Sequence, residues 1–421
     1  MKVFALPTLV AGSVAGLSII FYLALSNLLG DDRLGTLLLA QAIGGLIGVV
    51  SVPQCWVFLM ASRDEGEVRE RFSIGVRVEA RGFLTGLGLS IALMLLPLEI
   101  LAPVQDLFLL MFLSFFVQLC SSSFGLFRVR QAWKGYAAWS LMPNIIRAIL
   151  VAGFIFVPPR IARLSDLGLF ELSLIFFLAP EVLRFALLHI PNILRNFKAV
   201  EPAVMKRGTK QIFHNWLFDV GSGATDVCDR IVVGLLLGLN TLVAYFFARR
   251  MATLCLFVCE PFFAEMFRRI SIGAALGPIR LSYRRAYLMG LAIAAGMFLG
   301  VASGATAAWF VPPLKALIPE AILEMLPLFA GIMFIDSLNA ASKWGRYASQ
   351  RLAVGHKLLG VRLIAAISFY GSLAVAGGAG WEYIVLGFAF ACSIEAAYVY
   401  YLGFRSDIAP QSTAGSTLLL E

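Results

Sequence analysis

The chain has 421 residues, of which 60% are hydrophobic and only 14% are charged. A soluble globular domain contains about 45–50% apolar and about 25% charged residues, so this composition excludes a soluble domain and predicts that lipid surrounds most of the chain. The net charge of +9 does not indicate a nucleic-acid partner. The basic residues gather in the loops of one membrane side, where they suit anionic lipid headgroups.

Twelve apolar segments are long enough to cross a membrane, since a spanning helix needs about 20 mostly apolar residues. Their apolar runs are continuous and do not alternate, which predicts helices rather than barrel strands. In chain order the predicted spans are 4–29, 34–60, 83–101, 104–127, 139–157, 170–189, 212–239, 242–267, 286–311, 321–340, 357–377 and 381–404.

A weak internal repeat relates the turn after the first span to the turn after the seventh. Six residues recur at a shift of 208, which is almost half of the chain: Leu28, Leu29, Gly30, Leu34, Ala40 and Pro53 return as Leu236, Leu237, Gly238, Leu242, Ala248 and Pro261. The repeat predicts a duplicated helical bundle, which is a common way to build a transporter.

The loops predict the orientation and the division of the chain. With the N-terminus in the cytoplasm, 25 of the 34 Lys and Arg residues fall on the cytoplasmic side, 4 on the other side and 5 inside spans. This asymmetry predicts that both termini are cytoplasmic. We expect an all-α polytopic membrane protein with two six-helix lobes, arranged as a parallel repeat around a central cleft. The expected parts are lobe 1–189, cytoplasmic linker 190–211, lobe 212–404 and cytoplasmic tail 405–421.

The seventh span carries a polar stripe at membrane depth. At 100° per residue its six members fall within about 100° of one another on a helix; they are Asn215, Asp219, Ser222, Asp226, Asp229 and Arg230. A charge near the centre of a spanning helix costs about 2.5–3.5 kcal/mol on insertion scales. The stripe is therefore either an ion-pair network that joins two helices or the polar, ion-coupling wall of a hydrated cleft.

Other charged residues are also predicted at membrane depth. Arg249 and Arg250 in the eighth span are placed to pair with Asp229. Arg147 lies in the middle of the fifth span beside Pro143 with no evident partner, which favours a cavity role. With Arg230, these three arginines form a candidate cationic site for a phosphate-bearing substrate.

Two further spans carry acidic or basic residues whose role the sequence leaves more open. Asp336 in the tenth span is a further candidate for the cleft. Glu181 and Arg184 in the sixth span are interpreted as a structural pair or as side chains that reach the interface.

The chain lacks the motifs of the common enzyme classes. It contains no G-x-x-x-x-G-K-[ST], H-E-x-x-H or G-x-S-x-G motif. Its six cysteines fall in spans without a C-x-x-C pair, so we expect packing roles, no metal and no cofactor. We predict a protein that is not an enzyme, and its energy source would be an ion gradient, the membrane potential or consumption of the product.

Two segments resemble a known family. LLGDDRLGTLLLAQAIGGL, and DRIVVGLLLGLNTLVAYFFARRM with Asp229 before its Leu-Gly turn and Tyr245 after it, are similar to the polysaccharide (O-antigen, Wzx-like) flippases of the MATE-like, or MOP, superfamily. The resemblance covers nearly the whole chain in span number and loop length. The first span lacks an acidic motif and Leu37 replaces a common aromatic residue, which leaves the ion coupling open.

The resemblance implies a flippase of the bacterial inner membrane. It would move an undecaprenyl-diphosphate-linked oligosaccharide to the periplasmic leaflet for exopolysaccharide or lipopolysaccharide synthesis. Its partners would be this polyprenyl-linked glycan, membrane lipids and other membrane proteins of polysaccharide assembly. Three alternatives stay open: a cation-coupled MATE-like exporter of small molecules, a membrane-embedded polysaccharide polymerase or glycosyltransferase, and a scaffold protein without transport activity.

Overall fold

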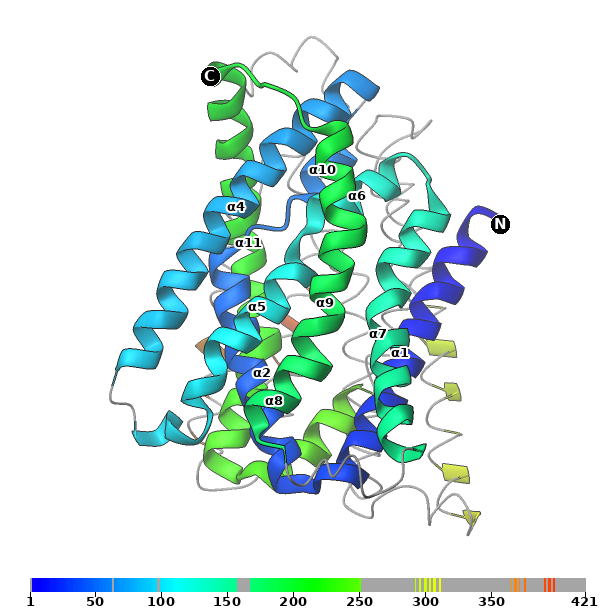
Figure 1. Cartoon of the computed structure of the whole chain (residues 1–421), viewed down its shortest axis with the longest axis vertical. Coiled ribbons are helices and arrows are strands. Elements are labelled where there is room, and N and C mark those ends of the chain that lie inside the picture. Colours follow the sequence, from blue (N-terminus) through cyan, green and yellow to red (C-terminus); the bar gives the residue numbers. More distant parts are fainter. Residues whose placement is uncertain are drawn as a thin grey trace. The chain divides into compact units, whose positions relative to one another are not determined.

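The computed structural model describes residues 2–62, 64–96, 99–156 and 167–250, with isolated residues between 292 and 397. The chain forms two compact units, Met1–Phe247 and Ala248–Glu421, and the elements described below belong to the first (Figure 1). Every element in the described ranges is helical. The elements are α1 Lys2–Leu29, α2 Asp31–Ser51, α3 Trp56–Met60, α4 Glu65–Leu95, η1 Glu99–Leu107, α5 Phe108–Leu119, α6 Ser121–Val129, α7 Trp133–Phe156, α8 Leu169–Ser173, η3 Leu174–Leu178, α9 Ala179–Arg184, η4 Phe185–His189, α10 Ile190–Asn196, α11 Pro202–Val232 and η5 Val233–Leu237.

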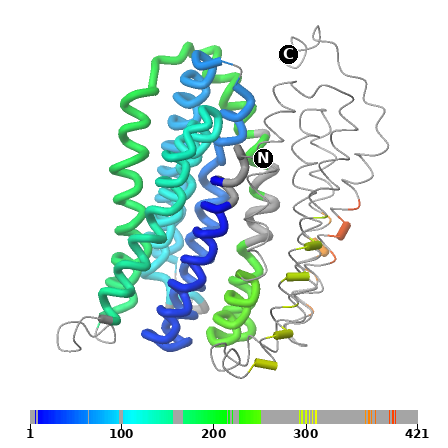
Figure 2. Tube along the Cα trace, turned by 90° about the vertical axis from the view of Figure 1, so that its right-hand side faces the viewer, coloured from blue at the N-terminus to red at the C-terminus, as the bar shows by residue number. Residues whose placement is uncertain are grey.

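Six of the described helical segments are long and apolar enough to cross a membrane, as the composition predicts. Figure 2 shows the long helices of the first unit running side by side. Large apolar side chains point outward from several of them, among them Leu9, Leu84, Leu95 and Ile149. Such exposure is expected where the solvent is lipid, and the protein is therefore a multi-pass membrane protein.

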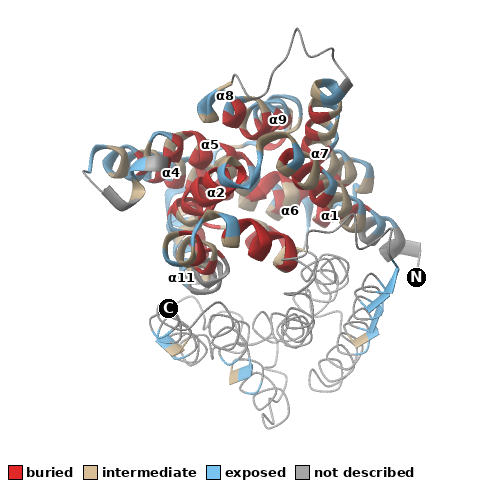
Figure 3. Cartoon of the chain, turned by 90° about the horizontal axis from the view of Figure 1, so that it is seen from below, coloured by how far each residue is buried: buried red, intermediate tan, exposed pale blue. Residues whose placement is uncertain are grey.

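Helix α2 lies at the centre of this unit. In its most apolar window 83% of the residues are buried, compared with 28% in α4. It packs against α5, α11 and α4, while α1 packs against α7. In Figure 3 the buried residues are concentrated around α2 and α5.

Helix α4 is longer than the apolar pattern predicts. We expected a loop at 61–82 before the third span, but α4 begins at Glu65, where the Asp64 side chain accepts a hydrogen bond from the Glu67 N–H at 2.8 Å. Ion pairs between residues four apart then continue the helix through the charged segment, as between Arg71 and Glu67 at 2.5 Å. Hydropathy marks where a helix enters lipid and not where the helix begins.

The polar segment 190–211 is also largely helical. It contains α10 and the first residues of α11, which begins at Pro202 with proline in the first turn, where its missing N–H has no cost. Only 197–201 lies between the two helices. The division of the chain into lobes at this segment stays a prediction.

The repeat is confirmed in the backbone of its two turns. Gly30 has φ 77° and ψ 163°, and Gly238 has φ 94° and ψ 164°. Both values lie in a region that only glycine adopts readily. In each turn the glycine carbonyl accepts a hydrogen bond at 3.1 Å from the N–H four residues later, which belongs to Leu34 or to Leu242. The same local structure therefore recurs at the 208-residue shift.

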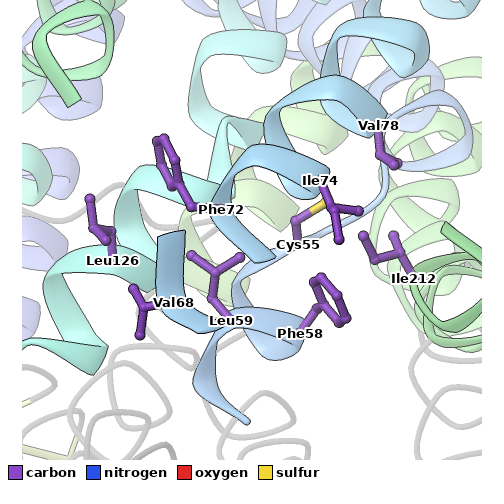
Figure 4. Packing of buried hydrophobic residues seen from close by; sticks show 9 residues of the cluster. All are labelled: Cys55, Phe58, Leu59, Val68, Phe72, Ile74, Val78, Leu126 and Ile212. Atoms are coloured by element: carbon purple, nitrogen blue, oxygen red, sulfur yellow. The ribbon is translucent and has the colours of Figure 1, made fainter. Parts of the chain in front are cut away.

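One apolar cluster joins α11 to the earlier helices. It consists of nine buried residues from α4, α6, α11 and the segment around α3: Cys55, Phe58, Leu59, Val68, Phe72, Ile74, Val78, Leu126 and Ile212. Figure 4 shows Ile212 of α11 beside Phe58, Ile74 and Val78. We call this set the Phe58 cluster.

Candidate functional site

Arg147 is a buried residue of α7 with three protein partners. Its Nε donates to the carbonyl oxygen of Phe176 at 3.0 Å, and its Nη1 donates to Oδ1 of Asn144 at 3.3 Å. Its Nη2 lies 2.7 Å from Oε1 of Glu181 in α9. The sequence suggested a cation without a partner, and the structure corrects this point because Glu181 reaches it from the neighbouring helix.

Glu181 also binds Arg184, so that three charged side chains form one buried cluster. Nη2 of Arg184 lies 2.5 Å from Oε2 of Glu181, and this confirms the pair expected from the sequence. The Arg184 guanidinium also covers the Trp139 ring, with 4.7 Å from Cζ to the ring centre. Two guanidinium groups share one carboxylate, so the cluster carries one excess positive charge. We call Arg147, Glu181 and Arg184 the arginine cluster.

The arginine cluster does not include the polar stripe of the seventh span. In the described part of the chain the partners of Arg147 come from α7 and from 174–184, and none comes from α11. The sequence grouped Arg147 with the arginines of the seventh and eighth spans. That convergence stays a prediction.

The predicted stripe lies on a single helix, as its periodicity indicated. Asn215, Asp219, Ser222, Asp226, Asp229 and Arg230 all belong to α11. The side chains of Asp219, Ser222 and Asp226 lie outside the described residues, and Asn215 is half-buried. The role of the stripe as the wall of a cleft therefore stays a prediction.

Asp229 has a defined environment at the end of α11. It is fully buried, and its Oδ2 accepts a hydrogen bond from the Tyr245 hydroxyl at 2.5 Å. Its Oδ1 accepts a hydrogen bond from the backbone N–H of Arg230 at 2.7 Å. The eighth span thus supplies Tyr245 as a donor to this carboxylate. Arg249 and Arg250 belong to the other compact unit, so their pairing with Asp229 stays a prediction.

The structure describes the two remaining candidates, Arg230 and Asp336, only in part. Arg230 is half-buried at the end of α11. Asp336 lies outside the described residues. Within the described ranges, no group of three His, Cys, Asp or Glu residues is arranged to hold a metal ion.

The sequence interpretation missed one buried acid, Glu79, because it falls in the segment expected to be a loop. In the structure it lies in the middle of α4 and is 2% exposed. Its spacing did contain a signal, because Gly75, Glu79, Gly82 and Gly86 recur at helical intervals, and all four are buried. Small residues at this spacing let spanning helices approach closely.

Solved structures share this fold along almost the whole chain. A MATE transporter from Vibrio cholerae is 14% identical, with a TM-score of 0.67, and the match covers 96% of this chain and 95% of that one. A eukaryotic MATE transporter is 12% identical with a TM-score of 0.68, and 96% of each chain is covered. A multidrug resistance transporter of the MATE family in the MOP superfamily is 12% identical with a TM-score of 0.60, covering 96% of this chain and 94% of that one.

The class of protein follows from these likenesses at the level of fold. The chain is an all-helical, multi-pass membrane protein with the fold of the MATE transporters, which have twelve helices in two lobes. No protein-family profile matches the chain. No curated protein matches it in sequence either. The expected superfamily fold is confirmed, and the polysaccharide flippase branch stays a proposal.

Proposed function

We propose that this protein is a transporter that carries its substrate across the membrane by alternating access rather than an enzyme. The observation that carries this proposal is the likeness of 96% of the chain to MATE transporters of nearly equal length. An additional catalytic domain would leave a long stretch of chain without a counterpart in these structures. The expected localisation in a bacterial inner membrane, with both termini in the cytoplasm, belongs to this proposal.

The first substrate class is small organic molecules, exported in exchange for a cation. The structural likeness supports this class more directly than it supports a lipid flippase, because the similar structures are named as MATE transporters and one as a multidrug resistance transporter. The sequence disfavoured an exporter because of its intramembrane arginines. Arg147 is bound by Glu181 and by a backbone carbonyl, which weakens that objection.

The second substrate class is the polyprenyl-diphosphate-linked oligosaccharide implied by the sequence resemblance. The arginine cluster favours it, because two guanidinium groups against one carboxylate leave an excess positive charge that suits an anionic diphosphate. Membrane lipids and other membrane proteins of polysaccharide assembly would then be partners. Arg230, Arg249 and Arg250 remain the candidate cations of the cleft for this substrate.

Transport of both substrate classes by the purified full-length chain in proteoliposomes tests the proposal. One assay follows a fluorescent organic cation under an imposed pH gradient, and the other follows a fluorescent undecaprenyl-diphosphate oligosaccharide between leaflets. Protein-dependent movement of the cation alone identifies an exporter, and movement of the lipid alone identifies a flippase. If neither moves faster than in protein-free liposomes, the proposed function is wrong.

The flippase assignment has its own mutational test. Arg230→Ala and Arg249→Ala should lower lipid translocation while the protein still inserts, and the Lys variants should restore part of it, since Lys keeps the charge but loses the bidentate fork. Arg69→Ala is the matched control, because Arg69 is an exposed residue of α4 that pairs with Glu65 across one helical turn. Equal translocation by all these variants would remove the cleft arginines from the substrate path.

A further inference from the structure

Two helices of the first unit are broken, and their breaks meet at α4. The second predicted span is interrupted between Ser51, the end of α2, and Trp56, the start of α3. The fourth is interrupted at Cys120, whose φ of −64° and ψ of 66° end α5 and begin α6. Helices α3, α4 and α6 all pack against one another. Each break leaves backbone N–H groups of a new helix start without intrahelical acceptors.

A single carboxylate oxygen connects both helix starts. Oε1 of Glu79 accepts a hydrogen bond from the N–H of Ser122 at 2.8 Å, which satisfies the start of α6 directly. It also accepts one from the Ser121 hydroxyl at 3.0 Å. That same hydroxyl oxygen accepts hydrogen bonds from the N–H groups of Cys55 at 2.6 Å and Trp56 at 3.2 Å, at the start of α3.

The other carboxylate oxygen has no such partner. Oε2 of Glu79 is buried without a hydrogen bond, and the neighbouring Ser122 Oγ is buried without one as well. Gly75 lies one helical turn earlier and leaves the space for this hydroxyl, because a Cβ atom there would stand 2.5 Å from Ser122 Oγ. A carboxylate oxygen of Glu79 and the hydroxyl of Ser122 are therefore both buried without a hydrogen bond, and a proton on Oε2 would give the carboxyl group a hydrogen to donate.

The described surroundings of Glu79 contain no cation to balance its charge. No Lys, Arg or His among the described residues of α2, α3, α5, α6, α10 or α11 lies within ion-pair distance of it. The titratable groups that face it are the thiols of Cys55 and Cys120. The Arg184–Glu181 pair acts on Cys120 from the side of α9. A carboxylate buried without a cation is costly, and taking up a proton removes that cost.

We propose that Glu79 is a proton-binding site that couples proton movement to the change of conformation between the two helix breaks; the coupling rests on the proposed function as a transporter. In the protonated state the proton sits on Oε2 and is donated to Ser122 Oγ, while Oε1 keeps its two hydrogen bonds. In the ionised state the carboxylate holds the Ser122 N–H and the Ser121 hydroxyl more strongly, since charge-assisted hydrogen bonds are the stronger ones. The Ser121 hydroxyl in turn accepts from the N–H groups at the start of α3. Protonation thus weakens the link between α3 and α6.

The position of this link gives protonation a mechanical effect. Discontinuous spanning helices occur where transporters bind their ions and change conformation. Glu79 is placed so that one proton acts on two such discontinuities, the α2–α3 break and the α5–α6 break, at the same time. The Phe58 cluster, which includes Cys55 and Leu126 from the same two regions, would transmit a shift of α3 or α6 to Ile212 of α11.

Infrared spectroscopy of the full-length protein as a function of pH tests the proton site without requiring any substrate. A protonated carboxyl group has a C=O stretching band that a carboxylate lacks. The wild type should show a carboxyl band that disappears on raising the pH and is missing in Glu79→Gln. The matched control Glu70→Gln lies on the same helix, half exposed beside Lys198, and should keep the band. If Glu79→Gln titrates like the wild type, the proton site is wrong.

Folding and coupling are tested separately. Gln reproduces the protonated side chain, with an oxygen that accepts and an NH₂ group that donates, so Glu79→Gln should fold and its thermal unfolding should depend less on pH than that of the wild type. In proteoliposomes that transport a substrate, Glu79→Gln should lose the dependence on the pH gradient. A variant that keeps this dependence refutes the coupling role. A wild type that transports neither substrate refutes the proposed function, while the infrared result still decides the proton site.

Discussion

Arg147 donates its Nε hydrogen to the carbonyl oxygen of Phe176 at 3.0 Å, and this carbonyl of the π-helical segment η3 has no α-helical donor. The N–H four residues later would belong to residue 180, which is proline. A reciprocal arrangement exists on the facing helix, where Pro143 leaves the Trp139 carbonyl without its donor and Arg184 approaches it at 3.5 Å. Each helix contains a proline that frees a carbonyl and an arginine that serves the carbonyl of the other helix.

Arg147→Ala should destabilise the protein strongly. The change leaves Glu181 with Arg184 and removes the guanidinium donor from the Phe176 carbonyl, and breaking a buried ion pair costs about 3–5 kcal/mol. Thermal unfolding of the purified protein in detergent measures the loss. Arg69→Ala removes an exposed pair with Glu65, which is worth about 0–1 kcal/mol. Equal unfolding temperatures for the two variants would show that the arginine cluster does not stabilise the fold.

A double-mutant cycle between Pro180→Ala and Arg147→Lys tests the role of the proline. Alanine at position 180 restores an N–H that can reach the Phe176 carbonyl, so Arg147 Nε is no longer needed there. Lys keeps the charge near Glu181 but lacks Nε. The loss of stability caused by Arg147→Lys should therefore be smaller in the Pro180→Ala background, with a coupling of about 0.5–3 kcal/mol. Additive effects of the two substitutions would contradict this explanation of the contact.

Tyr245→Phe should destabilise the protein more than Tyr22→Phe. The Tyr245 hydroxyl donates to the buried Asp229 carboxylate, whereas the Tyr22 hydroxyl donates to the neutral side chain of Gln41 at 3.0 Å. Hydrogen bonds to charged groups contribute about 1.5–3 kcal/mol and those between neutral groups about 0.5–1.5 kcal/mol. Both tyrosines are buried, Tyr22 at 5% and Tyr245 at 3% exposure, so the comparison separates the two acceptors and not the degree of burial. Thermal unfolding in detergent measures the stability of both variants. A larger loss of stability in Tyr22→Phe than in Tyr245→Phe would refute the stronger hydrogen bond assigned to Tyr245.

Gly30→Ala and Gly238→Ala should each destabilise the protein by about 1–3 kcal/mol, because both turns hold a backbone conformation that only glycine adopts without strain. Gly16→Ala is the control, since Gly16 lies inside α1 and a Cβ atom there meets no other atom within 4 Å. Alanine at that position should be neutral or slightly stabilising. Chemical or thermal unfolding compares the three variants. Equal stability of all three variants would show that the backbone of the two glycine turns does not require glycine.

The sequence predicted the class of fold well because lipid imposes a simple rule. A spanning segment must satisfy its own backbone hydrogen bonds and present apolar side chains, so the first six apolar segments correspond to the described spanning helices. The extents of α4 and α11 were missed for a physical reason. Capping and ion pairs between residues four apart extend a helix beyond the lipid, and the apolar pattern does not report them.

The candidate site was predictable only in part. Periodicity placed Asp229 and Arg230 on one helix, but it could not identify Tyr245 as a donor to Asp229 or Glu181 as the partner of Arg147. Such contacts depend on how far neighbouring helices are rotated and shifted, which small packing residues decide and hydropathy does not. Glu79 shows the same limit, because its importance depends on two helix breaks that meet only in three dimensions.

The apolar contact of Ile212 has a consequence for the order in which the chain is assembled. Eight of the nine residues of the Phe58 cluster precede position 127, and the ninth follows some 86 positions after Leu126 in the sequence. During synthesis the early helices can insert and pair, but this cluster keeps an open apolar side until α11 arrives. A nascent chain stopped before residue 202 should therefore expose this surface to proteases or chaperones, and a chain released after α11 should not.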